Sequence, residues 1–276
     1  MSTFEVKSVY DLNDFIALIS FLRSDNGCPW DRVQTHTSIK RNLLEEAYEL
    51  AETIEQDDKF HMMEELGDVL MQVLFHTDIE SDAGSFTLQD VANHACHKLV
   101  TRHPNVFGEK TDLDWDQIKR VERGEVTVSS EMNDVVKSLP SLWRADKIQR
   151  KAAKIGYDWP DVSYALDKIE EEAQELREGV AAGDADNIEE ELGDLIFATV
   201  DAARILGVDP EAAVHRACEK AIGRFRYMEQ QAAKHNTTLE QMSLAEMEGL
   251  HQQARQDLEG KEPVFDKMQE FQEMQK

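Results

Sequence analysis

The chain has 276 residues, enough for one large domain or two small ones, and its 41% of hydrophobic residues can supply a core, which excludes wholesale disorder. Lysine and arginine number 30 against 56 aspartates and glutamates, so the formal net charge is −26. Because nucleic-acid-binding proteins carry a basic surface, we expect no nucleic-acid partner.

The cellular compartment follows from what the sequence lacks. No segment approaches the roughly 18 consecutive apolar residues of a membrane helix, and the first residues, MSTFEVKSVYDLND, contain no apolar signal-peptide core. The three cysteines, Cys28, Cys96 and Cys218, are far apart and form neither a disulfide framework nor a zinc-finger spacing. We therefore expect a cytoplasmic protein with reduced thiols and no membrane contact.

An internal repeat organises the chain. The segment EEAYEL at 45–50 recurs as EEAQEL at 171–176, and EELGD at 64–68 recurs as EELGD at 190–194. Both copies lie 126 residues further on, and twelve of the thirty-two positions from 44 to 75 are identical at that offset. Because chance acidic similarity would not preserve both the Gly-Asp pair and the spacing, the sequence predicts a duplicated domain.

The boundaries of the two repeats follow from local composition. The segment 127–141 has no sustained hydrophobic period, contains a serine pair and ends near Leu139-Pro140, which is typical of a linker. We place the first repeat at 8–126, the linker at 127–141, the second repeat at 142–260 and a polar tail at 261–276.

Each repeat is expected to be helical. One apolar stripe of helical period runs through Ile188, Leu192, Leu195, Ile196 and Thr199, and a matching stripe runs through Leu166, Ile169, Ala173, Leu176 and Val180. Only the short turn 181–186 separates them, so the two helices should pack antiparallel along these stripes. Strand-like alternation is nearly absent, and the expected fold class is all-α, with two helical bundles in tandem.

Two pairs of acidic residues flank these stripes. Glu172 and Glu175 are spaced i, i+3 on the first helix, and Glu191 and Asp194 are spaced likewise on the second. In an antiparallel hairpin the pairs can converge, and four carboxylates close together need protons or cations at neutral pH. Oxygen ligands alone favour Mg²⁺ or Mn²⁺. The alternative is an ordinary solvated glutamate-rich face, but the paired spacing occurs twice.

A glycine precedes the aspartate in both repeats. Gly67 and Gly193 each cost a helix about 1 kcal/mol, which a surface position need not bear. We interpret them as positions where a neighbouring helix or a ligand approaches the backbone.

At these residues the sequence resembles the MazG family of all-α nucleoside triphosphate pyrophosphohydrolases, in its tandem, full-length form. The resemblance extends over almost the whole chain, through Cys28-Pro29-Trp30-Asp31, 102–107, Ser138-Leu139-Pro140, 144–149, Gly156-Tyr157-Asp158-Trp159 and 220–225. It implies Mg²⁺-dependent hydrolysis of nucleoside triphosphates between the α and β phosphates, giving a monophosphate and pyrophosphate. It also implies a homodimer and a housecleaning role in the nucleotide pool.

Site residues follow from the resemblance by motif position. It implies that the metal ligands are Glu172, Glu175, Glu191 and Asp194, with a second set at Glu46, Glu49, Glu65 and Asp68. A metal-bound water would attack phosphorus, and Glu171 or Glu190 would be the general base; spacing does not choose between them. The positions expected to contact the nucleotide are Lys168, Glu171, Asn187, Glu190, Asp194, Lys220, Arg224 and His251.

Two of these positions depart from the family pattern. Asn187 stands where relatives have a lysine, so one phosphate contact weakens, and His251 stands where they have a tryptophan that stacks on the base. The second repeat is expected to be catalytic, because it alone has Lys168, where the first repeat has Asn42. Trp30 and Trp159 could floor a base, although a core position is the simpler interpretation.

Other function classes compete with this one. A di-iron carboxylate bundle needs Glu-x-x-His on two helices, and neither acidic hairpin has it. A scaffold that binds nucleotide or a partner without turnover stays open, as does an enzyme restricted to one deoxynucleotide or phosphoribosylated nucleotide.

Overall fold

The computed structural model describes residues 4–108, 113, 117–118, 124 and 127–259, and within these ranges the regular elements are all helices. The chain divides into two compact units, Met1–Gly124 and Glu125–Lys276. An all-α chain of tandem helical domains is therefore confirmed. No helix in the described ranges has the length and apolarity needed to cross a membrane.

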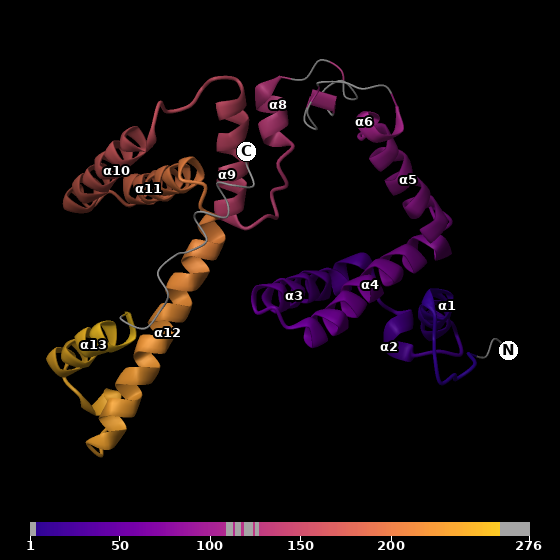
Figure 1. Ribbon diagram of the computed structural model, residues 1–276, viewed down its shortest axis with the longest axis horizontal. Coiled ribbons are helices and arrows are strands. Elements are labelled where there is room, and N and C mark those ends of the chain that lie inside the picture. The colour runs from indigo at the N-terminus through magenta and orange to yellow at the C-terminus, as the bar shows by residue number, and fades with distance from the viewer. Residues whose placement is uncertain (1–3, 109–112, 114–116, 119–123, 125–126, 260–276) are drawn as a thin grey trace. The chain divides into compact units, whose positions relative to one another are not determined.

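The first unit is built around a helical hairpin. Helices α3 and α4 pack side by side along most of their length, joined by the turn at 56–58 (Figure 1). Helix α1 packs against α4, and α5 continues from its far end. Within residues 4–108, the helices of this unit are α1 (Leu12–Arg23), α2 (Pro29–Arg32), α3 (His36–Glu55), α4 (Lys59–Asp82), α5 (Leu88–Thr101) and α6 (Pro104–Phe107).

The core of the first unit lies where α1, α3 and α4 meet. Ile19, Ile39, Leu74 and Phe75 are buried there and contact one another. Arg23 at the end of α1 donates from Nε to Asp78 Oδ2 at 2.8 Å, which ties α1 to α4. The core therefore sits on the side of the hairpin that α1 covers.

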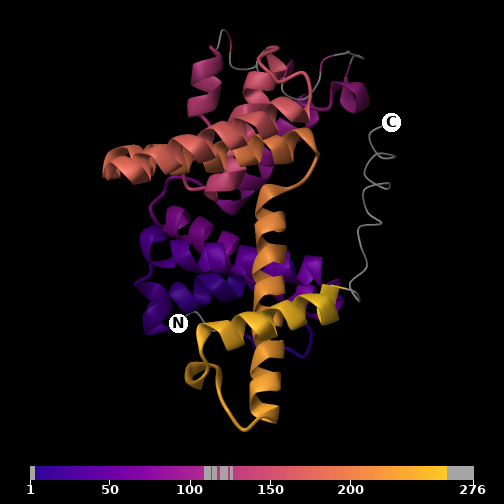
Figure 2. The ribbon, with the colours of Figure 1, turned by 90° about the vertical axis from the view of Figure 1, so that its left-hand side faces the viewer.

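The second unit repeats the hairpin and adds a long C-terminal arm. Helices α10 and α11 form the hairpin, α9 packs across α11, and α13 crosses the far part of α12 (Figure 2). The helices of this unit are α8 (Val128–Asn133), α9 (Ser141–Lys154), α10 (Val162–Ala182), α11 (Ala185–Ile205), α12 (Pro210–Lys234), the 3₁₀ turn η1 (Leu239–Gln241) and α13 (Leu244–Glu259).

The structure describes the segment that was expected to be a linker, but it does not describe the expected tail. Helix α8 lies inside 127–141 and packs against α9, so part of this segment is helical and belongs to the second unit. The tail 261–276 lies outside the described residues.

Small residues are buried on both helices of the hairpin of the second unit. Ala165 and Gly179 are buried on α10, and Ala198 is buried on α11. A Cβ built at Gly179 would meet the amide oxygen of Asn187 on the facing helix, so a larger residue here would displace that side chain.

The prediction that the apolar stripes meet each other was wrong at four positions. Leu166, Val180, Leu192 and Ile196 are at least 46% exposed. These larger apolar side chains therefore lie at the surface, where they leave an open apolar face on the hairpin.

Candidate functional site

Local sequence sets the geometry of the α10–α11 hairpin. The carboxylate of Asp161 accepts from Ser163 N at the start of α10, and that of Asp184 accepts from Asn187 N at the start of α11. Between them Gly183 ends α10 with φ of 69°, a left-handed conformation that glycine adopts without strain. The hairpin therefore turns in two residues and brings the acidic segments of both helices face to face.

Three carboxylates meet on this hairpin. One oxygen each of Glu172, Glu175 and Glu191 lies within 4.8 Å of the others, so the three can hold one ion. Glu172 is buried, with 5% of its surface exposed, while Glu175 is exposed. Asp194 is not part of this trio, but it lines the adjacent cavity together with Glu172.

Lys168 sits one turn before the acidic cluster and neutralises part of it. Its Nζ lies 2.6 Å from Glu172 Oε1 and 3.0 Å from Glu171 Oε1. The hydrogen bond from Lys168 lowers the pKa of Glu172. Burial, together with the neighbouring Glu172 and Glu191, raises the pKa of Glu175. The cluster thus holds its buried carboxylate charged, with the lysine as the counterion.

The first repeat contains the same trio without the lysine. Oxygens of Glu46, Glu49 and Glu65 also lie within 4.8 Å of one another on α3 and α4. Burial raises the pKa of Glu46, and the neighbouring Asp68 adds to the increase. Asn42 occupies the position of Lys168, so the two clusters share their acids and differ in charge balance.

The remaining sequence-predicted residues fall into two groups. Asn187 faces the cluster, and its Nδ2 donates to Glu191 Oε1 at 2.8 Å, so it holds a candidate ligand in place. Glu190 is exposed and lies outside the trio. Three others do not line the cavity in this chain: Lys220 and Arg224 lie on α12, and His251 lies on α13.

Neither of the two glycines of the acidic motif lies against a neighbouring helix. A Cβ built on Gly67 or on Gly193 would have no heavy atom of another part of the chain within 4 Å. The expectation that a neighbouring helix approaches them was wrong, since the close approach occurs at Gly179 instead. Open space next to the Gly193 backbone leaves room for a ligand.

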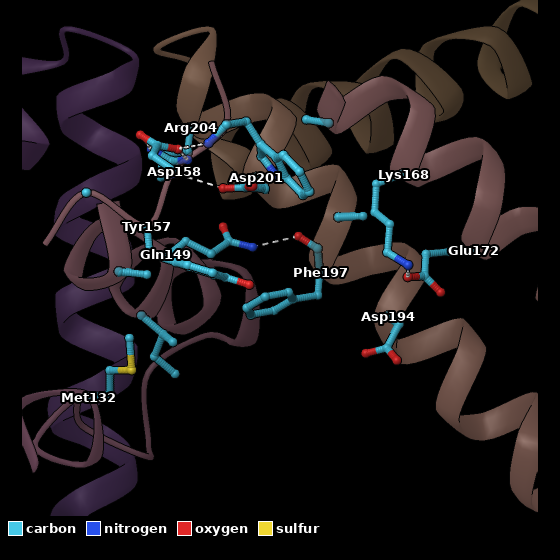
Figure 3. Close-up of a pocket in the computed structure, with 16 residues that line it drawn as sticks. Met132, Gln149, Tyr157, Asp158, Lys168, Glu172, Asp194, Phe197, Asp201 and Arg204 are labelled. Carbon is cyan, nitrogen blue, oxygen red and sulfur yellow. Dashed lines mark hydrogen bonds and ion pairs between the residues drawn. The ribbon is translucent and has the colours of Figure 1, made fainter. Parts of the chain in front are cut away.

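A cavity of about 700 Å³ opens beside the cluster of the second repeat (Figure 3). Lys168, Glu172 and Asp194 lie at one end of it. The rest of its wall is contributed by α8, α9, the loop 156–159, the first turn of α10 and the second half of α11. These residues are Met132, Ile148, Gln149, Ala152, Gly156, Tyr157, Asp158, Trp159, Ala165, Phe197, Ala198, Asp201 and Arg204.

Most of this wall was missed by sequence reasoning. Trp159 was interpreted as a core residue, yet it is 43% exposed and lines the cavity. Its ring stacks on Tyr164 with centroids 6.1 Å apart and planes 6° apart. The aromatic residues at 157 and 159 in the loop before the acidic hairpin were the available signal, since aromatic residues near a polar site often contact ligands.

Arg204 fixes the polar side of the cavity. Its guanidinium donates to both oxygens of Asp158, and its Nε donates to Asp201 Oδ1 at 2.8 Å. Only 9% of its side chain is exposed. This arginine is paired with two carboxylates, just as Lys168 at the other end of the cavity is paired with Glu171 and Glu172.

Comparison with known proteins shows which family this sequence is similar to. The sequence profile of the MazG nucleotide pyrophosphohydrolase domain matches twice, at residues 34–107 and 163–228. A "nucleoside triphosphate pyrophosphohydrolase/pyrophosphatase MazG" from Thermotoga maritima is 40% identical over 245 residues, covering 88% of this chain and 94% of the relative. A nucleoside triphosphate pyrophosphohydrolase from Escherichia coli is 38% identical over 242 residues, covering 84% of this chain and 91% of the relative. An uncharacterized protein YabN from Bacillus subtilis is 42% identical over 261 residues, covering 91% of this chain and 53% of the relative.

Proposed function

The chain belongs to the MazG family of nucleotide pyrophosphohydrolases, and on that premise we propose that it hydrolyses nucleoside triphosphates at the α–β phosphate bond in a Mg²⁺-dependent reaction. The products are a nucleoside monophosphate and pyrophosphate. The observation that carries this proposal is the junction of the acidic trio with the cavity: Glu172 belongs to both, and Lys168, which contacts Glu172, lines the cavity.

The donor set fits a hard divalent cation. Glu172, Glu175 and Glu191 offer oxygen ligands only, within 4.8 Å of one another, and neither histidine nor cysteine belongs to this group. Asp194 at the cavity wall is the candidate for a fourth ligand. When bound there, Mg²⁺ supplies neutralisation of phosphate charge and a more acidic water.

The chain's own residues supply the remaining functions. Lys168 keeps Glu172 ionised in the resting protein and is placed to turn toward a phosphate oxygen. Glu171, at 3.0 Å from the same lysine, and Glu190 are the two candidates to accept the proton of the attacking water. The ion pair between Lys168 and Glu171 favours Glu171 as the general base, because Lys168 would then connect this carboxylate to the phosphate.

We assign catalysis to the second repeat. Its acidic trio has Lys168 beside it, whereas the trio of the first repeat has Asn42 at that position. At this position only the second repeat therefore has a cation that could contact a phosphate oxygen.

The open apolar face of each hairpin supports a homodimer. Val180 and Leu192 in the second repeat are 60% and 46% exposed, and the equivalent Ile54 and Leu66 in the first repeat are 57% and 53% exposed. Burial of such a face against a second copy removes it from water. Leu192→Glu should convert the dimer to a monomer in light scattering, while Leu244→Glu, at an exposed position on α13, should not; a monomeric parent protein would contradict the proposal.

The biological role follows from the reaction and the charge. A hydrolase of nucleoside triphosphates with a net charge of −26 is suited to clearing unwanted nucleotides in the cytoplasm rather than to acting on nucleic acid.

Product analysis tests the proposal. ATP and the deoxynucleoside triphosphates are incubated with Mg²⁺ and the parent protein, Glu172→Ala or Glu46→Ala, and the products are separated by ion exchange. We expect monophosphate and pyrophosphate, lost in Glu172→Ala and retained in Glu46→Ala. Loss in Glu46→Ala alone would move catalysis to the first repeat, and release of orthophosphate with a diphosphate would refute the bond assignment. Nucleotide binding without any product would leave a non-catalytic scaffold.

A further inference from the structure

Two histidines of the first unit face each other outside its acidic trio. His36 is the first residue of α3, and His76 lies on α4. Their Nδ1 atoms are 2.7 Å apart, and the two rings are stacked with centroids 5.0 Å apart and planes 7° apart. On the other side of the first ring, His36 Nε2 lies 2.6 Å from Glu80 Oε1, which also belongs to α4. The three side chains therefore form a line of hydrogen bonds that joins the start of α3 to the last part of α4.

The second repeat shows that the hairpin forms without this cluster. At the offset of 126 residues, the positions of the three polar side chains hold apolar residues, which are Val162, Ala202 and Leu206. Val162 is the first residue of α10, just as His36 is the first residue of α3, so the two hairpins begin in the same register. Because the same hairpin is built with apolar residues at these positions, the cluster adds a property that the fold itself does not require.

The short contact between the two rings limits the charge that they can carry together. Only one hydrogen fits between two nitrogens that are 2.7 Å apart, so one ring donates this hydrogen and the other ring keeps a bare Nδ1. A ring with a bare nitrogen is a neutral imidazole, because both nitrogens of an imidazolium carry hydrogen. While this hydrogen bond persists, the pair therefore carries one positive charge at most.

The surroundings of the two rings differ, and they direct the single charge to His36. Hydrogen bonds from Ser85 and His36 lower the pKa of Glu80, so this carboxylate is ionised beside His36 at neutral pH. Burial, followed by the proximity of His36, lowers the pKa of His76. The second nitrogen of that ring, His76 Nε2, is buried and has no hydrogen-bond partner among the described residues. One positive charge is therefore stabilised on His36, next to Glu80, while His76 stays neutral.

The charged groups that α1 and α5 bring to this end of α4 have partners of their own. Both helices pack against α4. Arg23, the last residue of α1, donates to Asp78 and Asp82 of α4. Asp90, in the first turn of α5, accepts from the backbone and the hydroxyl of Thr87. We therefore attribute the proton balance of the histidine cluster to its own three side chains.

We propose that His36 and His76 form a pH-sensitive latch of the first unit. At neutral pH their shared hydrogen bond holds the first turn of α3 against α4. When both rings take up protons from solvent, two N–H groups meet where one hydrogen fits, so the bond breaks and the first turn of α3 separates from α4. In the unfolded chain both rings become charged near about pH 6.5, so the folded state binds fewer protons and loses stability as the pH falls. The second repeat has apolar residues at these positions, so acidification should open this contact in the first unit alone.

Ring-nitrogen resonances test the latch in the unmodified chain. The full-length protein is labelled with ¹⁵N at histidine, and its imidazole signals are followed by NMR from about pH 8 to about pH 5. His36→Val and His76→Ala assign the two rings. We expect the rings to titrate as a coupled pair, with His36 charged first and His76 neutral until the pH is lower by at least about one unit. Two rings that become charged independently and over the same pH range would overturn the proposal.

A double-mutant cycle tests whether the shared hydrogen bond stabilises the unit. His36→Val and His76→Ala, which install the residues of the second repeat, are made singly and together. Hydrogen exchange of peptides from α3 and α4 is measured by mass spectrometry in the full chain and corrected for the intrinsic rate at each pH. Losses of packing occur in the single variants and cancel in the cycle. At about pH 7.5 the two substitutions should be non-additive by about three- to tenfold in protection, and at about pH 5 this coupling should vanish. Additive effects at both pH values, or a coupling that persists at the lower pH, would overturn the latch.

A third histidine of the same hairpin provides the matched control. His61 Nδ1 lies 2.6 Å from Asp58 Oδ2, and the second repeat has Asn187 at this position. The hydrogen bond with Asp58 raises the pKa of His61, so this pair is strengthened, not weakened, as the pH falls. The parent protein should lose about tenfold in protection of α3 and α4 between about pH 6.5 and pH 5, and His61→Asn should keep that loss. The double variant His36→Val/His76→Ala should lack it. An unchanged loss in the double variant, or its disappearance in His61→Asn, would overturn the proposal.

Discussion

Replacement of Lys168 by methionine tests how the acidic cluster is held together. In the resting protein its Nζ lies 2.6 Å from Glu172 Oε1. Methionine keeps an apolar stem of similar length and removes the charge. Glu172 then faces Glu175 and Glu191 without a counterion, so we expect the metal-free variant to be less stable.

The size of the effect follows from the distance and the exposure. Two unit charges 2.6 Å apart attract by about 6 kcal/mol at an effective dielectric constant near 20 and by about 1.6 kcal/mol in bulk water. The Lys168 side chain is 35% exposed and that of Glu172 is 6% exposed. Solvent screening and the cost of desolvation therefore reduce the net contribution to about 1–2 kcal/mol. For a domain of this size the Tm should fall by about 2–8 °C.

The same variant should bind metal more tightly. In the parent protein a divalent cation competes with Lys168 for Glu172, so removal of the lysine should increase Mg²⁺ affinity by about five- to thirtyfold, which is the same 1–2 kcal/mol. Turnover should nevertheless fall, because the lysine no longer meets the phosphate. Thermal unfolding with and without Mg²⁺, calorimetric metal titration and kcat/KM measure the three effects.

Arg41→Met provides the control for this experiment. Arg41 forms an exposed i, i+4 pair with Glu45 in the first repeat, and its loss should leave stability and metal affinity nearly unchanged. If Lys168→Met had unchanged stability and equal or weaker Mg²⁺ affinity, the reasoning that Lys168 neutralises the cluster would be refuted.

Three further substitutions probe the scaffold. Arg204→Met leaves Asp158 and Asp201 without their counterion, so the free energy of unfolding measured by urea denaturation should fall by about 2–4 kcal/mol. An unchanged denaturation midpoint would contradict a structural role for these ion pairs. Burial, aided by His36, lowers the pKa of His76 below its usual 6.5, so the unfolded chain takes up a proton first as the pH falls. The stability of the first unit should therefore decline below about pH 6.5, and His76→Phe should flatten this dependence in denaturation curves measured from pH 5 to about pH 8. Gly193→Ala places a Cβ in open space, so we expect a gain of about 0.5–1 kcal/mol in stability. A simultaneous loss of nucleotide affinity would show that the ligand uses that space.

The sequence by itself determined the duplicated, all-helical architecture and the acidic trio. Helical periodicity is a local property, so residues three or four apart share a face whatever surrounds them. That is why residue spacing predicted Glu172 and Glu175 on one face of their helix, and the short turn between the helices predicted that Glu191 converges on them. The repeat added a second instance of the same pattern at Glu46, which removed chance as an explanation.

Only the tertiary structure decided which faces meet and what lies beside the acids. Periodicity indicates that a helix has an apolar stripe, but whether the stripe is buried depends on what packs against it, and here Leu192 stays exposed. The cavity wall joins residues from 132 to 204 that share no local spacing. The unpaired oxygen of Gln149 exists only because the backbone oxygen of Phe197, on another helix, holds the amide nitrogen. Contacts between distant segments arise from packing, and no period along the chain encodes them.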